Sequence, residues 1–216
     1  TISGRTRPNS PSAYAPRFKQ GATIVPRNCY FVRLHEADDA LDPSRVYWAE
    51  TDPQQAESAK PPYRDVNLSG PIEGVFLFRS ALSKHLLPFR LEPAATVALP
   101  LRIRGSESAL LDVDGLRQAG YRDFAKWMAQ VERIWASKRG RKAGRQSVYE
   151  RLDYGKGLTS QDLRTRYLVL YNAAGTNLAA AYLDRRSVPI PFVVEHKLYW
   201  AAFEDEDEAA FLTAIL

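Results

Sequence analysis

Cysteine and histidine are scarce in this sequence of 216 residues, which holds one cysteine and three histidines, and long apolar runs are missing altogether. A single thiol, Cys29, has no partner for an internal disulfide, and so few ligands cannot be arranged at the usual zinc spacings. No apolar stretch approaches the ~18 residues that are needed to cross a bilayer. We therefore expect a protein of the reducing cytoplasm, outside the membrane and without a structural metal.

The chain also lacks an initiating methionine and a charged-then-apolar leader, and its last residues, Phe211–Leu216, stop inside an apolar run. Both ends indicate a piece of a longer protein. Residues 1–20 are rich in Ser, Pro and Arg without a hydrophobic period, which predicts an irregular linker. Residues 21–216 have the length of one domain, and the whole chain is 45% apolar.

Short β-branched and aromatic runs, separated by Pro, Asp and Gly, predict strands at Cys29–Leu34, Arg45–Trp48, Gly74–Phe78, Thr96–Leu99, Tyr167–Tyr171, Leu178–Leu183, Phe192–Val194 and Leu198–Phe203. The last four are expected to form two antiparallel pairs, the first of them a hairpin around turn-forming residues. A polar loop is predicted at Asp52–Asp65, and helices at Ser80–Leu87 and Glu206–Leu216. The pattern predicts an α+β fold dominated by antiparallel sheet.

The strongest helical period covers about Tyr121–Ser137. One face of this segment carries the apolar residues Phe124, Trp127, Met128, Val131 and Ile134. Such a stripe is typical of a helix that packs on a hydrophobic core. We expect it to be structural.

Positive charge is concentrated just after this helix, although the net charge of the whole chain is only +5. Between Arg133 and Arg151 the sequence has seven basic residues and one acid. Its centre, Lys138–Gln146, holds two glycines and no large apolar side chain, which predicts a mobile loop with a polyanionic partner. A solvated loop that only aids solubility is the alternative. The residues expected to contact phosphates or base edges are Arg133, Lys138, Arg139, Arg141, Lys142, Arg145, Gln146, Tyr149, Arg151, Lys156, Gln161, Arg164 and Arg166.

A second pattern, Lys60-Pro61-Pro62-Tyr63, resembles the Asn-Pro-Pro-Tyr tetrapeptide with which adenine methyltransferases hold the exocyclic amine of a flipped base. Lysine has donors and no acceptor, so Lys60 cannot accept the amine hydrogens. No Gly-rich loop follows a strand near the N-terminus to bind a nucleoside cofactor. We therefore expect no catalytic residue and no cofactor in this chain, and a Pro-stiffened surface loop at this position.

Two further patterns leave other functions open. Asp184 and the later Glu195-His196-Lys197 resemble the two carboxylates and the lysine of magnesium-dependent nucleases. The alternative is a strand end with ordinary polar side chains. The five acids Glu204–Glu208 stand at the start of the last helix, where the helix dipole favours negative charge, and they also allow a non-enzymatic protein-interaction module.

Four phrases together are more specific than any single motif. They are Gln20–Arg27 with Tyr30–Val32, Leu152–Gln161, Tyr171–Asn177, and Glu195–Trp200 with the acidic helix start. In this order they resemble the region downstream of the catalytic domain in adenine-N6 DNA methyltransferases and fused restriction-modification enzymes. The resemblance runs from about Gln20 to Leu216.

The resemblance implies that this region recognises the DNA target. In that family an upstream Rossmann-like domain binds S-adenosylmethionine and flips the adenine, so the cofactor is expected in the parent protein and not in this chain. A contact between this region and the upstream domain is expected as well. Lys60 and the missing cofactor loop agree with a chain that begins after that domain.

Overall fold

The computed structural model describes residues 12–35, 41–92, 95–173 and 178–216, except the side chains of 56–58 and Lys142. It contains two principal sheets with helices packed on them, and most of the strand pairs are antiparallel. The predicted α+β class is confirmed. No helix in the described part of the chain is both long and apolar enough to span a membrane.

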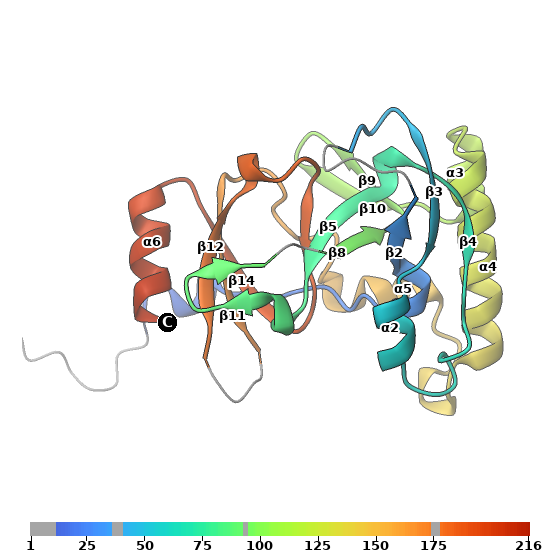
Figure 1. Cartoon of the computed structure of the whole chain (residues 1–216), viewed down its shortest axis with the longest axis horizontal. Helices are drawn as coiled ribbons and strands as arrows, with labels where there is room; N and C mark the ends of the chain where they lie inside the picture. Colours follow the sequence, from blue (N-terminus) through green and yellow to red (C-terminus); the bar gives the residue numbers. More distant parts are fainter. Residues whose placement is uncertain (1–11, 36–40, 93–94, 174–177) are drawn as a thin grey trace, which may run out of the picture.

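The larger sheet has six strands and lies in the right half of the molecule in Figure 1. Its order is β13 (Phe192–Val194), β5 (Leu77–Ala81), β8 (Ala95–Ala98), β2 (Phe31–Leu34), β3 (Val46–Thr51) and β4 (Ser69–Glu73). The period of two is clear in β3, where Tyr47 and Ala49 are buried while Val46 and Trp48 are exposed. One face of this sheet therefore belongs to the core.

The predicted amphipathic helix is α4 (Arg122–Lys138), which packs beside β4. Its apolar stripe is buried as expected, apart from the half-buried Ile134. The indole of Trp127 donates to the backbone carbonyl of Cys29 at 3.0 Å, which ties the helix to the sheet. The carboxylate of Glu73 accepts from the first amides of the helix, those of Asp123 and Phe124. This cap comes from another element, so the local sequence did not reveal it.

The smaller sheet has the order β1 (Lys19–Gln20), β14 (Leu198–Phe203), β11 (Tyr167–Asn172) and β12 (Ala180–Asp184). Helix α6 (Glu206–Ile215) packs against β11 and β12 at the left of Figure 1. The hairpin of β11 and β12 is confirmed, and part of its turn, 174–177, lies outside the described residues. The second expected pair is wrong. Strand β13 runs parallel to β5 in the larger sheet, while β14 pairs with β11.

Several local predictions are corrected by tertiary packing. The strand expected from Cys29 begins as helix α1 (Arg27–Tyr30), and the loop expected at 52–65 contains helix α2 (Pro53–Ser58). The helix expected at 80–87 is instead the end of β5 and a 3₁₀ turn, because Ser80 and Ala81 pair with neighbouring strands. The remaining elements are short: α3 (Val113–Gln118), α5 (Val148–Leu152), and the two-stranded sheets of β6 (Leu86–Leu87) with β7 (Arg90–Leu91) and β9 (Leu101–Arg104) with β10 (Glu107–Leu110).

The described end of the expected linker, residues 12–20, belongs to the fold. Strand β1 pairs with β14, and the ring of Phe18 meets that of Tyr171 edge-on at 5.2 Å. The guanidinium of Arg17 pairs with Glu208 at 2.8 Å. A segment without hydrophobic period can still add an edge strand, because the partner strand supplies the hydrogen bonds.

The acidic stretch that follows β14 is used largely inside the molecule. The side chain of Asp205 caps α6 by accepting from the amide of Glu208 at 2.8 Å. The carboxylate of Glu206 accepts from the hydroxyls of Tyr167 and Tyr182. Three of the five acids therefore have a partner inside the protein: Asp205, Glu206, and Glu208 through its ion pair with Arg17. Glu204–Asp207 are nevertheless exposed at the surface.

Candidate nucleic-acid interface

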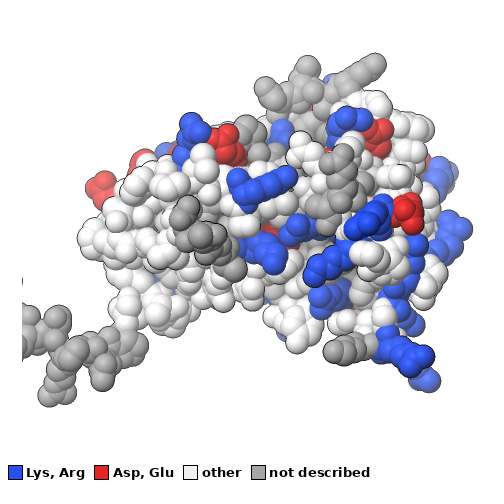
Figure 2. All heavy atoms as spheres, turned by 60° about the horizontal axis from the view of Figure 1, so that its bottom comes forward, with Lys and Arg blue, Asp and Glu red and all other residues white. Residues whose placement is uncertain are grey.

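A groove of about 650 Å³ lies where four segments, distant in sequence, come together at the C-terminal end of α4. It is lined by Val25, Pro26, Arg27, Asn28, Ala59, Lys60, Pro61, Tyr63, Trp135, Gly140, Ala143, Gln146, Arg151, His196 and Lys197. Four of these side chains are cationic, and no described residue of the lining is acidic. Figure 2, which turns the lower side of Figure 1 forward, shows Lys and Arg gathered on this side with few Asp or Glu among them.

The aromatic wall of the groove is fixed by contacts on both of its sides. The ring of Tyr63 is nearly parallel to that of Trp135, with 6.4 Å between centroids and 15° between planes. The indole of Trp135 donates to the backbone carbonyl of Gln146 at 2.8 Å. The ammonium of Lys138 donates to the carbonyl of Pro62 at 2.9 Å and so joins the end of α4 to this wall.

A buried carboxylate, that of Glu195, organises the floor of the groove. Its oxygens accept from the guanidinium of Arg27 at 2.9 Å and from the amide of Lys197 at 2.7 Å, and Nδ1 of His196 lies 2.7 Å from Oε1. Burial by itself would raise the pKa of Glu195, but His196, Arg27 and the Lys197 amide outweigh it and hold that pKa below its ordinary value. The charged Glu195 therefore keeps Arg27 and His196 in place at the floor.

The basic segment that was expected to be a mobile loop is partly fixed. It forms a 3₁₀ turn over Arg141–Ala143, and the guanidinium of Arg139 donates to the carbonyl of Gln146 at 2.8 Å. This prediction is therefore wrong for Arg139 and Gln146, whose contacts hold the segment against Trp135. Arg141 and Arg145 are exposed and pair with no acid among the described side chains, and the side chain of Lys142 lies outside the described part.

Of the other residues expected to contact DNA, Arg151 lines the groove, while Lys156 and Arg164 are exposed at other positions. Arg133 is exposed on α4 and donates to the carbonyl of Ala129 at 3.2 Å. These three residues outside the groove extend the cationic character of the surface without forming a cluster with it.

Three of the residues expected to contact DNA have contacts inside the protein. The amide of Gln161 is buried and bonds the backbone of Val194 in both directions. Arg166 pairs with Asp184 at 2.8 Å, and its side chain is half-exposed. The hydroxyl of Tyr149 donates to Glu132 at 2.8 Å. Burial, and after it this hydrogen bond, raises the pKa of Tyr149. All three side chains donate hydrogen bonds, and the acceptors that the structure shows belong to the protein itself.

Two of the phrases that carry the family resemblance meet at the groove. The first supplies Val25–Arg27, and the last supplies His196 and Lys197. A third packs behind them, since a Cβ at Gly157 would touch the backbone of 21–22 at 3.5 Å. Neither a protein-family model nor a curated protein matches the chain.

The nuclease pattern has no assembled site. The carboxylate of Asp184 is held by Arg166 and by the amide of Arg186 at 3.0 Å, and these contacts lower its pKa. The carboxylate of Glu195 is fully buried and is held by Arg27. Among the residues that the structure describes, no three His, Cys, Asp or Glu side chains come together where a metal ion could bind. Both carboxylates therefore serve ion pairs.

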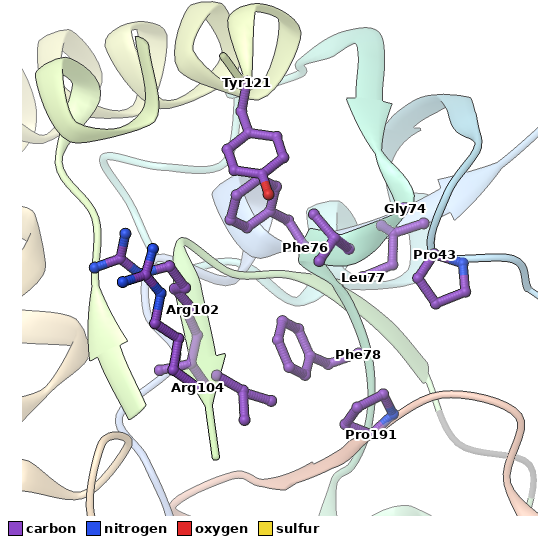
Figure 3. Close-up of a pocket in the computed structure, with 12 residues that line it drawn as sticks. Pro43, Gly74, Phe76, Leu77, Phe78, Arg102, Arg104, Tyr121 and Pro191 are labelled. Atoms are coloured by element: carbon purple, nitrogen blue, oxygen red, sulfur yellow. The ribbon is translucent and has the colours of Figure 1, made fainter. Parts of the chain in front are cut away.

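A second, mainly apolar pocket of about 320 Å³ lies near the other end of α4. Figure 3 shows Arg102 and Arg104 of β9 side by side at one edge of it, with Tyr121 above the apolar side chains. The ring of Tyr121 meets that of Phe76 edge-on at 4.8 Å. A helix of 17 residues is about 25 Å long, so this pocket is separate from the groove.

The sequence interpretation missed three of the groove cations as a set. Arg27 was one residue of a family phrase, and Lys197 belonged to the nuclease pattern. Lys60 was the residue that departs from the Asn-Pro-Pro-Tyr tetrapeptide. Only tertiary structure brings residues 27, 60 and 197 to one place. The sequence did offer one indication, because each of these three residues belongs to a motif that the sequence analysis had considered.

Proposed function

We propose that this chain is the DNA-binding target-recognition region of an S-adenosylmethionine-dependent adenine-N6 DNA methyltransferase of a restriction-modification system. The observation that carries the proposal is the groove with four cationic side chains and no acidic one among its described lining. The convergence of the family phrases on this groove supports the same function. Double-stranded DNA as the partner and a cytoplasmic location are parts of the same proposal.

The groove cations suit a phosphate backbone because three of them pair with no described acid, and the fourth, Arg27, pairs with a carboxylate that is buried beneath the groove surface. Lys60 and Lys197 are exposed, and neither they nor the half-buried Arg151 pairs with an acid among the described side chains. The buried Glu195 presents Arg27 without filling the groove. Each phosphate that such a cation neutralises releases condensed counterions, which gives affinity for any DNA sequence.

The chemistry of methyl transfer belongs to another domain in this proposal. The groove does not suit S-adenosylmethionine, because the sulfonium and ammonium groups of the cofactor would face four cations, and the described lining offers no carboxylate to the ribose hydroxyls. Lys60, in the place of the asparagine of the methyltransferase tetrapeptide, cannot accept the hydrogens of an adenine amine. This chain therefore positions the duplex, and the upstream domain that it contacts binds the cofactor and extrudes the adenine.

The test is a titration of labelled duplex DNA by fluorescence anisotropy at several salt concentrations. Four groove cations and the exposed Arg141 and Arg145 predict neutralisation of roughly four to six phosphates, so log Kd plotted against log salt should have a slope of about 4 to 5. Calorimetry of the same protein with S-adenosylmethionine should give no heat of binding. A duplex affinity that does not change with salt, or binding of the cofactor, would contradict the proposal.

A further inference from the structure

The pocket between β9 and the start of α4, which the proposed function leaves without a role, combines an apolar interior with two arginines. We infer that it is the docking site of an acidic polypeptide segment from a partner, which inserts one aromatic side chain into the pocket and places a carboxylate on the arginines. The site is separate from the groove, and the inference does not rest on DNA binding.

The interior of the pocket is built from side chains that the core already holds. Phe76, Leu77 and Phe78 are buried, and Figure 3 shows Pro191 below Phe78. The volume of about 320 Å³ stands at the lower end of the range of about 300–1,000 Å³ that small-molecule sites occupy. Such a space suits a single aromatic side chain, which brings roughly 150–250 Å² of surface to be buried.

Part of the apolar lining is open to solvent. Val75 and Ile103 line the pocket, and they are 41% and 36% exposed. A molecule confined to the cavity would leave both of them in contact with water. A polypeptide whose backbone crosses the mouth would cover them, and the removal of adjoining apolar surface from water favours binding. The exposed lining therefore favours a protein segment over a small molecule.

Three polar side chains set the charge of the occupant. Arg102 and Arg104 lie two residues apart in β9, so they leave the same face of the strand, and Figure 3 shows them together at one edge of the pocket. Neither pairs with an acid among the described side chains, and the described lining holds no acid. A guanidinium binds a carboxylate through two parallel hydrogen bonds. The hydroxyl of Tyr121, which has no hydrogen-bond partner in the described part of the chain, can donate to the same group.

Helix α6 of a second copy is the alternative occupant, because the exposed face of α6 carries Asp207 and, one turn later, Phe211. In Figure 1, α6 lies at the left and β9 in the right half of the molecule. A contact between these two places joins different patches of the two copies, so it would extend into chains or rings. The inference therefore commits to a different polypeptide, and the experiment tests the second copy as well.

The experiment titrates a fluorescein-labelled peptide, Asp-Glu-Phe-Glu-Asp with blocked ends, with the whole chain and follows fluorescence anisotropy. The peptide should bind with saturation. Arg102→Gln together with Arg104→Gln should weaken binding by about tenfold or more, because the guanidinium–carboxylate contacts are lost. A peptide with alanine in place of the phenylalanine should lose a similar factor, because nothing fills the apolar interior.

Two matched variants separate the pocket from general electrostatics. Arg90→Gln with Arg117→Gln removes the same charge from arginines that pair with acids of their own segments. Lys60→Ala with Lys197→Ala removes groove cations that also attract an acidic peptide. Both variants should keep the peptide affinity within about threefold. The glutamine variant of the pocket should keep its duplex affinity within about threefold, which also shows that it is folded.

Absence of saturable binding, or an equal loss of affinity in either control variant, would overturn the inference and leave the proposed function standing. Displacement of the peptide by phenylacetate, with an affinity equal to that of the peptide, would show a site for a small acid and would also overturn it. So would self-association of the wild type, measured by light scattering, that the glutamine variant of the pocket abolishes. A wild type that binds the peptide and not duplex DNA would instead overturn the proposed function alone.

Discussion

Changing Lys60, Arg151 and Lys197 together to alanine should lower the affinity for duplex DNA by about two to three orders of magnitude at 0.1 M salt. Each lost phosphate contact removes about 0.9 from the log–log salt slope, so the slope should fall by about 2.7. The three side chains contribute little to the fold, because none is buried and none pairs with a described acid. Their removal should change the free energy of unfolding by only about 0.5 kcal/mol each.

A control with the same change in net charge separates the groove from general electrostatics. Three cations on other elements each pair with an acid of their own segment, and these are Arg90, Arg117 and Lys126. Their replacement by alanine should leave the salt slope within about 1 of the wild-type value. Fluorescence anisotropy on one labelled duplex measures both variants. A control variant that lost as much affinity as the groove variant would show that the groove has no special part in binding.

Replacing Glu195 by alanine should destabilise the protein by about 3 kcal/mol. The side chain of Glu195 is fully buried, and that of Arg27 is 24% exposed, so the arginine left behind is only partly able to reach water. The same change removes the acceptor of the Lys197 amide. Urea unfolding at neutral pH measures the loss. Glu50→Ala is the comparison, because Glu50 pairs with Arg33 and His35 at the exposed surface, where solvent screens such pairs and they contribute little to stability.

The effect of Glu195 should depend on pH in a defined direction. Its pKa is lowered in the folded protein, so its contribution to stability is complete above the pKa of the unfolded chain, about 4.3, and is lost as the pH falls through the folded pKa. The stability difference between wild type and Glu195→Ala should therefore be constant near neutral pH and shrink in acid. A difference that grew as the pH fell, or a variant no less stable than Glu50→Ala, would contradict the role given to Glu195.

Local sequence predicted the elements whose burial pattern is carried by their own residues. Helix α4 and the hairpin of β11 and β12 are examples, because a period of 3.6 or 2 is visible within each segment. Strand β13 had its bounds predicted correctly and its partner wrongly. Its three residues are all buried, so their pattern does not distinguish one sheet from the other. The residues that bond its end, Ala22 and Gln161, are distant in the sequence.

The candidate site was predicted less completely than the fold. The basic segment pointed to the right end of α4 and included Arg151 and Gln146, which line the groove. Gln161 was misassigned because a sequence shows the donors of a side chain and not the internal acceptor that uses them. Arg27 could not be placed, since its position depends on a buried carboxylate far along the chain.

The most direct test of the central claim maps where duplex DNA touches the protein. Amide chemical shifts of the ¹⁵N-labelled chain should be followed during a titration with a short duplex at low salt. We expect the largest changes in the segments that form the groove, 25–28, 59–63, 138–146 and 196–197, and almost none in α6. Changes centred on α6 and β12, or on the second pocket at β9, with the groove amides unmoved, would contradict the account.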